Sequence, residues 1–129
     1  MLFRSTRQKG EFRTYRVQGH VRYANGLPAS QVKVAAFDND LNSEQLLGES
    51  VTDDGGSYSI EYSRGLLIEP GRGAANLVLR AYDASDSSVG QSSVHYGVQG
   101  EATIDLTIPH YRKSLRAVFM WLISRLRGL

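Results

Sequence analysis

The stretch Thr52-Asp53-Asp54-Gly55-Gly56-Ser57-Tyr58-Ser59-Ile60 holds the clearest fold signal in the chain. Its first half carries the Asp and Gly residues that tight turns use for side-chain hydrogen bonds and for positive φ angles. Its second half spaces Tyr58 and Ile60 two residues apart, which puts both side chains on one face of a strand. The stretch therefore predicts a hairpin turn followed by a strand with one buried face.

The same pattern recurs on both sides of this stretch, with turn signals about ten residues apart. Asn25-Gly26 predicts another hairpin turn, and the alternation in Val32-Lys33-Val34-Ala35-Ala36-Phe37 predicts a strand that points Lys33 toward solvent. Such spacing is typical of an all-β sandwich. We expect seven strands, at residues 15–23, 31–37, 45–51, 57–62, 76–82, 89–96 and 102–108.

The longest connection, residues 63–75, contains three glycines and a proline, which discourage continuous secondary structure. We expect this segment to cross from one sheet to the other. If the strands run up and down, the loops fall into two groups at opposite ends of the sandwich. One end receives residues 24–30, 52–56 and 83–88, and the other receives residues 38–44, 63–75 and 97–101.

After Pro109 the apolar residues change to a helical spacing, which predicts an amphipathic α-helix over residues 110–129. The segment has five basic residues and no acidic one. We expect it to contact a protein partner, a second copy of the chain or an anionic membrane surface. The residues expected to make that contact are Arg112, Lys113, Leu115, Arg116, Phe119, Trp121, Leu122, Arg125 and Leu126.

An alternative is that the apolar stripe of this helix docks on the chain's own sheet, with its basic residues facing an acidic body. Met120, Trp121 and Ile123 widen the apolar surface beyond one stripe, so such docking would still leave apolar surface exposed. Oligomerisation or capture of a partner would cover that remainder.

Length and charge divide the 129 residues into a basic tail (1–14), a sandwich (15–109) and the helix (110–129). The middle part has a net charge of −6 between two basic ends, a poor match to a nucleic-acid-binding domain. There is no cysteine for disulfides or thiolate metal sites. The N-terminus lacks the apolar stretch of a secretory signal, and the longest apolar run, 117–123, is too short to span a bilayer.

Two resemblances refine this interpretation. The carboxypeptidase-regulatory-like domain is resembled by four stretches: Val17-Gln18-Gly19-His20-Val21, Asn25-Gly26-Leu27-Pro28, Val32-Lys33-Val34 and residues 52–60. This resemblance implies a transthyretin-like Greek-key sandwich. Residues 36–49 and 75–83 look like a module of bacterial insecticidal toxin-complex subunits. Together these similarities cover residues 15–108. They imply a noncatalytic structural, adhesion or receptor-facing role, so we expect a protein-interaction module of a bacterial toxin or secreted assembly. The alternative is a membrane-active or delivered toxin component that uses the basic amphipathic helix.

Catalytic and metal-binding patterns are weak in this sequence. The chain ends Leu126-Arg127-Gly128-Leu129, which departs from the Tyr-Arg-Gly-Ser ending of transthyretin-related hydroxyisourate hydrolases. The seven tyrosines lack the paired spacing of intradiol dioxygenases, and His20, His95 and His110 lack metal-ligand spacing. We expect no enzyme activity and no cofactor.

A small-ligand or calcium-binding sandwich is a further alternative, because loop carboxylates are hard-cation ligands. Asp53 and Asp54 share an expected loop end with Asp83 and Asp86. Asp38, Asp40 and Glu44 form a second acidic group. Asp is also a common turn residue, and ordinary turn chemistry is the competing interpretation of both groups.

Overall fold

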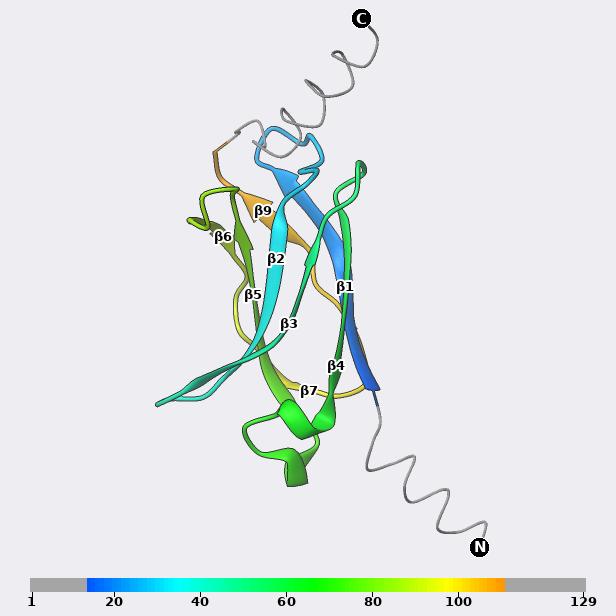
Figure 1. The fold of residues 1–129 in the computed structure, drawn as a ribbon, viewed down its shortest axis with the longest axis vertical. Helices are drawn as coiled ribbons and strands as arrows, with labels where there is room; N and C mark the ends of the chain where they lie inside the picture. The colour runs from blue at the N-terminus through cyan, green and yellow to red at the C-terminus, as the bar shows by residue number, and fades with distance from the viewer. Residues whose placement is uncertain (1–13, 111–129) are drawn as a thin grey trace, which may run out of the picture.

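The computed structural model describes residues 14–110, which form nine strands in two sheets (Figure 1). The predicted all-β sandwich is confirmed, whereas the helix predicted over residues 110–129 lies, apart from His110, outside the described residues. Two short 3₁₀ turns, η1 (Arg64–Leu66) and η2 (Pro70–Arg72), interrupt the connection between β4 and β5. The strands are β1 (Thr14–Tyr23), β2 (Lys33–Asn39), β3 (Glu44–Val51), β4 (Ser57–Ser63), β5 (Ala75–Tyr82), β6 (Ser88–Gln91), β7 (His95–Val98), β8 (Glu101–Thr103) and β9 (Leu106–Ile108).

The four-stranded sheet is built around β1, which pairs antiparallel with β4 and parallel with both β8 and β9. Val17 lies opposite Ile60 of β4, and on the other side of β1 it lies opposite Ala102 of β8. Val21 lies opposite Leu106 of β9. The odd-numbered residues of β1 from Tyr15 to Tyr23 point into the sandwich, as period-two alternation requires.

Gly19 lies where β8 gives way to β9. A Cβ at this position would come within 2.2 Å of the Ile104 carbonyl oxygen, so the close approach of the chain depends on glycine. Ile104 N–H donates to the Gln18 carbonyl at 2.9 Å, and the Asp105 carboxylate accepts from His20 N–H at 2.8 Å. These bonds interrupt the regular ladder, and the seventh predicted strand is therefore two short strands.

The five-stranded sheet has the order β3-β2-β5-β6, and β7 also pairs with β5. The sixth predicted strand is likewise divided, into β6 and β7, and Ser92 explains the break. Its Oγ accepts from Leu79 N–H at 3.0 Å while its own N–H donates to the Leu79 carbonyl at 2.8 Å. A side-chain hydroxyl thus takes the place of a strand carbonyl, and the ladder pauses there.

The hairpin predicted at residues 52–56 is wrong, because this turn joins β3 in one sheet to β4 in the other. The turn chemistry itself is present: Asp53 Oδ1 accepts from Gly55 N–H and Ser57 N–H, and Gly56 has a φ of 81°. Thr52 turns the chain toward the other sheet. Its buried hydroxyl donates to the Ala29 carbonyl at 2.6 Å, which ties the turn to the chain entering β2.

The turn predicted at Asn25-Gly26 is present, with Gly26 at a φ of 88° and its N–H donating to the Tyr23 carbonyl. The returning chain makes one isolated bridge, between Arg22 and Pro28, before it crosses to β2. The predicted second arm of a hairpin is therefore reduced to this bridge, in which Tyr23 N–H donates to the Leu27 carbonyl and Ala29 N–H donates to the Val21 carbonyl.

The crossover predicted at residues 63–75 is confirmed, because β4 and β5 lie in different sheets. The Arg64 guanidinium holds this loop by donating to the Pro70 carbonyl at 2.8 Å, and the buried Tyr15 hydroxyl donates to the Gly73 carbonyl at 2.9 Å. The chain thus reaches the second sheet through an ordered segment.

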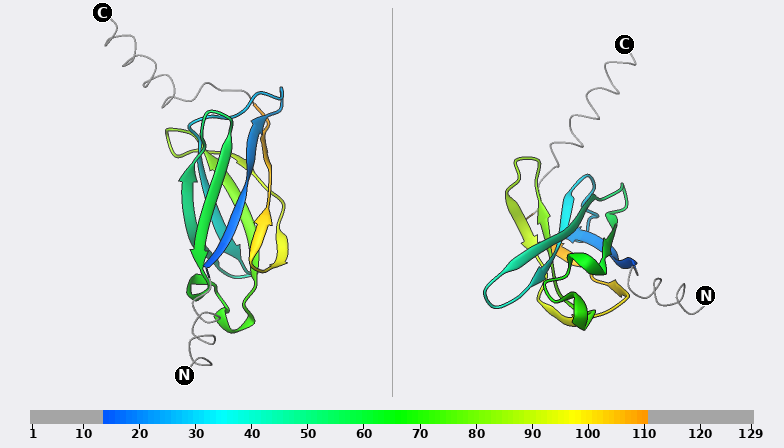
Figure 2. Two further views of the ribbon diagram at one scale, coloured as in Figure 1. Left: turned by 90° about the vertical axis from the view of Figure 1, so that its right-hand side faces the viewer. Right: turned by 60° about the horizontal axis from the view of Figure 1, so that its bottom comes forward.

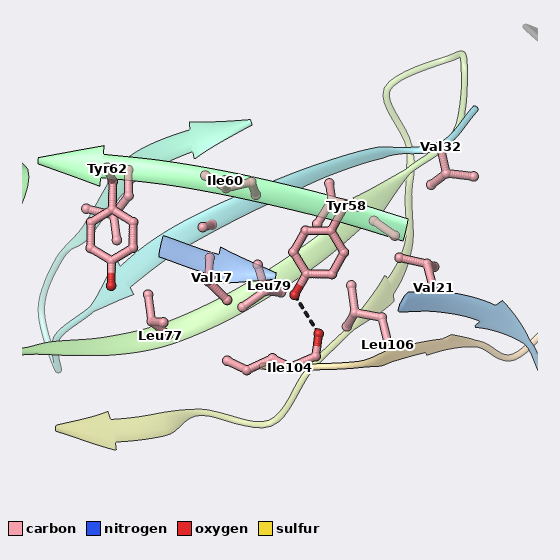
Figure 3. Close-up of a cluster of buried hydrophobic side chains, with 14 of the residues drawn as sticks. Val17, Val21, Val32, Tyr58, Ile60, Tyr62, Leu77, Leu79, Ile104 and Leu106 are labelled. Atoms are coloured by element: carbon pink, nitrogen blue, oxygen red, sulfur yellow. Dashed lines mark hydrogen bonds between the residues drawn. The ribbon is translucent and has the colours of Figure 1, made fainter. Parts of the chain in front are cut away.

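Apolar side chains from both sheets form one core between them (Figure 3). Tyr15 and Tyr62 meet edge to face at 5.7 Å between ring centroids. The Tyr58 hydroxyl donates a hydrogen bond to the Ile104 carbonyl at 2.5 Å. Fully buried members of the core from the two sheets include Val17, Val21, Val34, Leu77 and Leu79.

The loops gather at two ends of the sandwich, as predicted (Figures 1 and 2). The turns after β1, β3 and β5 lie at the end where β9 finishes, and the 3₁₀ turns lie at the opposite end. The β2–β3 hairpin projects sideways near that opposite end. The described part of the chain therefore enters at one end and leaves at the other.

Candidate interaction surface

The outer face of the five-stranded sheet is the candidate functional surface, and β2 and β5 form its centre. Their register places Lys33 opposite Tyr82, Ala35 opposite Arg80 and Phe37 opposite Val78. The intervening residues, among them Val34, Ala36, Leu79 and Ala81, belong to the core between the sheets. The three registered pairs therefore point outward. We call these six residues the outer layer.

The outer layer contains two residues that are buried although they face away from the core. Val78 is 0% exposed and Ala35 is 1% exposed. Their neighbours are long side chains: the Arg80 guanidinium lies 4.6 Å from the centre of the Phe37 ring, and the Lys33 ammonium lies 5.1 Å from the centre of the Tyr82 ring. This face therefore has a small apolar cluster of its own.

Carboxylates hold both cations of the outer layer in place. Glu44 accepts a bidentate pair of hydrogen bonds from Arg80, one of them at 2.7 Å, and Gln91 accepts a third at 2.9 Å. The hydrogen bonds from Arg80 lower the pKa of the Glu44 carboxyl. The pair thus stays ionised at neutral pH, with the guanidinium fixed above the Phe37 ring.

Lys33 is held in the same way, because its Nζ lies 2.9 Å from Asp86 Oδ1 and 3.6 Å from Glu49 Oε2. The hydrogen bond to Asp86 raises the pKa of the Lys33 ammonium. Lys33 is therefore the ion-pair partner of two carboxylates on this face.

Exposed apolar side chains extend this face along β3 and its hairpin. Leu46, opposite Phe37, is 44% exposed, and Val51, opposite Lys33, is 47% exposed. Leu41 at the hairpin tip is 98% exposed, in a turn closed by a 2.8 Å hydrogen bond from Asp40 N–H to the Ser43 carbonyl. We had not selected any of these three residues from the sequence.

A shallow pocket of about 70 Å³ lies between the hairpin, the crossover and β7. Asp38 is its buried carboxylate, and both of its oxygens are used: Oδ1 accepts from Asn76 N–H at 2.9 Å, and Oδ2 accepts from Ile68 N–H at 3.0 Å. This carboxylate therefore fastens the crossover to β2. The other residues around the pocket are Asp40, Glu69, Arg72, Ala74 and Gly97.

The four carboxylates considered for calcium occupy two similar turns. Asp53 Oδ1 accepts from the N–H groups two and four residues ahead, and Asp83 Oδ1 does the same with Ser85 and Ser87 at 2.9 and 3.0 Å. Asp86 binds Lys33, and Asp54 is exposed. Within residues 14–110, no three His, Asp or Glu side chains gather in a way that could hold a metal ion.

The three histidines considered as metal ligands in the sequence lie on separate elements where the structure describes them. His20 lies on β1 of the four-stranded sheet, His95 lies on β7 of the other, and His110 follows β9. Tyr62 has a buried hydroxyl for which the described residues supply no hydrogen-bond partner, and burial raises its pKa to about 12. Burial also raises the pKa of Tyr58. These tyrosines are core residues in this arrangement.

The residues selected for partner or membrane contact lie outside the described residues, and the structure places none of them. They are Arg112, Lys113, Leu115, Arg116, Phe119, Trp121, Leu122, Arg125 and Leu126. Among the described residues, no helix has the length and apolar character needed to cross a membrane.

No family model matches the chain, and no curated protein matches it in sequence. Several solved structures are similar in shape, including the following three. A 9R-lipoxygenase from Cyanothece PCC8801 has a TM-score of 0.49 and 22% identity, over 79% of this chain and 17% of the lipoxygenase. An alternative pilotin from the type II secretion system of Vibrio cholerae has a TM-score of 0.49 and 16% identity, over 77% of this chain and 100% of the pilotin.

The third structure is a chlorocatechol 1,2-dioxygenase from Pseudomonas putida, with a TM-score of 0.52 and 12% identity. The match covers 78% of this chain and 61% of the dioxygenase, so the chain spans less than two thirds of that enzyme. At this identity the likeness shows a common fold alone.

Proposed function

We propose that the chain is a noncatalytic structural and protein-interaction module. The sandwich serves as a scaffold, and the C-terminal segment, residues 110–129, serves as the attachment element. The outer layer is the observation that carries this proposal. A sheet in a sandwich needs one apolar face for the core, and a second apolar face is typical of a surface that another layer covers.

The use of charged side chains supports a noncatalytic role. Arg80 and Glu44 bind each other, and Lys33 binds Asp86. The one deeply buried carboxylate of the pocket, that of Asp38, accepts two backbone hydrogen bonds. Groups engaged in this way hold the fold together and are not poised to transfer protons or bind a substrate.

The finer parts of the proposal come from the sequence resemblances over residues 15–108. They support a transthyretin-like Greek-key topology of the carboxypeptidase-regulatory-like kind. They also support a place in a bacterial toxin complex or another secreted assembly, in which such a module presents a surface to a neighbouring subunit or receptor.

Light scattering on two full-length proteins tests the attachment role. We expect the native chain to form a defined oligomer and a Phe119→Asp/Leu122→Asp variant to remain monomeric, because two carboxylates on the apolar stripe prevent its burial. A chain ending at Pro109 should behave like the variant. Ser114→Asp is the matched control, since it adds charge outside the apolar set.

The same proteins are then mixed with vesicles containing anionic lipid. Monomers in every sample, without vesicle binding, contradict the attachment role. Vesicle binding by the native chain that the Phe119→Asp/Leu122→Asp variant loses would instead show a membrane-active protein. Oligomers that persist in the variant would move the contact to the sandwich itself.

A further inference from the structure

The outer layer leaves apolar surface uncovered in the described part of the chain. Leu46 and Val51 are nearly half exposed beside Phe37 and Lys33, on the same face of the sheet. Apolar side chains that cluster on one face of a sheet lower the free energy when another element packs on them.

The chain leaves the described region beside this sheet. A Cβ at Gly90 of β6 would lie 3.3 Å from the Thr107 carbonyl oxygen and 3.4 Å from Ile108 Cγ1 of β9. Among the described strands, β6 lies at one end of the order β3-β2-β5-β6. The described residues therefore end near the border of the five-stranded sheet.

The length of this segment suits the sheet. As a helix, its nineteen residues would extend about 28 Å. Four strands side by side extend about 15–19 Å. One helix could therefore cross the whole outer layer without a long linker.

Charge also favours this segment as the occupant. The described residues contain twelve acidic and six basic side chains, whereas residues 111–129 contain five basic and no acidic ones. On the face itself, three carboxylates, those of Glu44, Glu49 and Asp86, surround two cations. A basic segment thus meets an excess of negative charge there.

The spacing of Leu115, Phe119, Leu122 and Leu126 is i, i+4, i+7 and i+11, which is one stripe of a helix. Trp121 falls on another side of that helix. We propose that residues 111–129 dock in cis on the outer face of the five-stranded sheet through this stripe and present Trp121 outward. The outward side of the helix is then the surface that attaches to a partner, and this step of the inference rests on the proposed function.

Docking within one chain is favoured over docking between copies because the segment is joined directly to β9. A short connection gives a high effective concentration of the segment at the face. The result is a third layer, with the helix covering Phe37, Tyr82 and their neighbours.

A double-mutant comparison in the full chain tests the docking. Leu46→Lys/Val51→Lys adds positive charge and removes apolar contact on the face. Leu27→Lys/Leu66→Lys is the matched control, since these leucines are 50% and 42% exposed elsewhere. Each pair is measured with the native segment and with Phe119→Asp, by thermal unfolding.

We expect the face pair to lower Tm by about 3–6 °C more than the control pair when the segment is native. With Phe119→Asp the face pair and the control pair should have equal effects, because the segment is already released. Equal effects of the two pairs in both backgrounds would overturn the docking.

Amide NMR shifts provide a readout that does not depend on stability. Phe119→Asp should move the signals of Phe37 and Arg80 and leave those of Gln18 and Ser59 unchanged. If the Phe37 signal has the same shift in the native chain and in Phe119→Asp, the inference is contradicted. A dimer in which the segment of one copy covers the face of the other copy would also contradict it. If docking fails while Phe119→Asp/Leu122→Asp still abolishes the oligomer, this inference falls and the proposed function stands.

Discussion

The two sheets of the sandwich differ on their outer faces although they share one core. On the four-stranded sheet, the outward residues of β1 and β4 are all polar; those of β1 are Thr14, Arg16, Gln18, His20 and Arg22. On the five-stranded sheet, four of the six outer-layer residues are apolar or aromatic, and two of them, Ala35 and Val78, are fully buried. One face is suited to water, and the other face is suited to a covering layer.

This difference shows that side chains on the outer face of a sheet can be buried by their own neighbours on that face. Arg16 and Glu61 on the polar face form an ion pair that is about half exposed. Arg80 and Glu44 form a less exposed pair that also covers Phe37. The same chemical pair therefore has a different role on each face, and substitutions can separate the two roles.

The largest expected effect is at Gly19 of β1, the strand that pairs with β4, β8 and β9 in the four-stranded sheet. Gly19→Ala places a Cβ against the Ile104 backbone, which cannot move like a side chain. We expect a loss of about 2–4 kcal/mol in the free energy of unfolding, measured with urea. Gly71→Ala is the control, because a Cβ there meets nothing within 4 Å. A change below about 1 kcal/mol for Gly19→Ala would show that β8 and β9 can separate from β1.

Val78→Ala sharpens the comparison directly. Although Val78 faces outward, its complete burial predicts a core-like loss of about 1–3 kcal/mol, similar to that of Val17→Ala in the core. Ser59→Ala on the polar face should change stability by less than about 0.5 kcal/mol. Urea unfolding of the three variants measures this order. A Val78→Ala effect as small as that of Ser59→Ala would remove the distinction between the faces.

Arg80→Ala and Arg16→Ala compare the two ion pairs. Arg80→Ala removes the cover over Phe37 and leaves Glu44 without its partner, so we expect a loss of about 1 kcal/mol. Arg16→Ala should leave stability unchanged, since its pair with Glu61 lies in water. Thermal unfolding at low and high salt compares them. Equal effects of the two substitutions would mean that the Arg80 guanidinium over Phe37 does not contribute to the stability of the fold.

The smallest expected effect is a dependence on pH. Arg80 depresses the pKa of Glu44 in the folded chain, so this stabilisation is present above the carboxyl's ordinary value near 4.5 and is lost as pH falls through the lower, folded value. Below about pH 4.5 the free energy of unfolding should fall less steeply in Glu44→Gln than in the native chain. The difference between the two proteins should be less than about 1 kcal/mol. Glu61→Gln serves as the comparison on the polar face. An unchanged acid profile in Glu44→Gln would show that the Arg80 pair does not stabilise the fold.

The sandwich, the crossover and the grouping of loops could be predicted because alternation and turn residues are local signals. The division of two strands could not, since it depends on Gly19 meeting Ile104 and on Ser92 bonding Leu79, far apart in sequence. The wrong hairpin prediction at residues 52–56 also results from contacts between residues that are distant in sequence. Turn chemistry sets the bend, whereas Thr52 and the chain near Ala29 decide which sheet follows.

The apolar outer face left a signal that we missed. Val34-Ala35-Ala36-Phe37 and Leu77-Val78-Leu79 are unbroken apolar runs. We interpreted the first run as alternation with one buried face, although continuous runs are typical of strands buried on both faces. A count of consecutive apolar residues would have identified β2 and β5 as strands with two apolar faces. The exposure of Leu41 depends on the projecting hairpin, which no local pattern describes.

Hydroxyl-radical footprinting of the native full-length chain, read by mass spectrometry, tests most directly whether the outer face is covered. Leu27, Leu46 and Leu66 have the same side chain and similar exposure, 50%, 44% and 42%, within the described residues. If residues 111–129 cover the face, Leu46 will be oxidised several-fold more slowly than the other two leucines, and Phe119→Asp will restore its rate. Equal oxidation of all three leucines in the native chain would contradict the account.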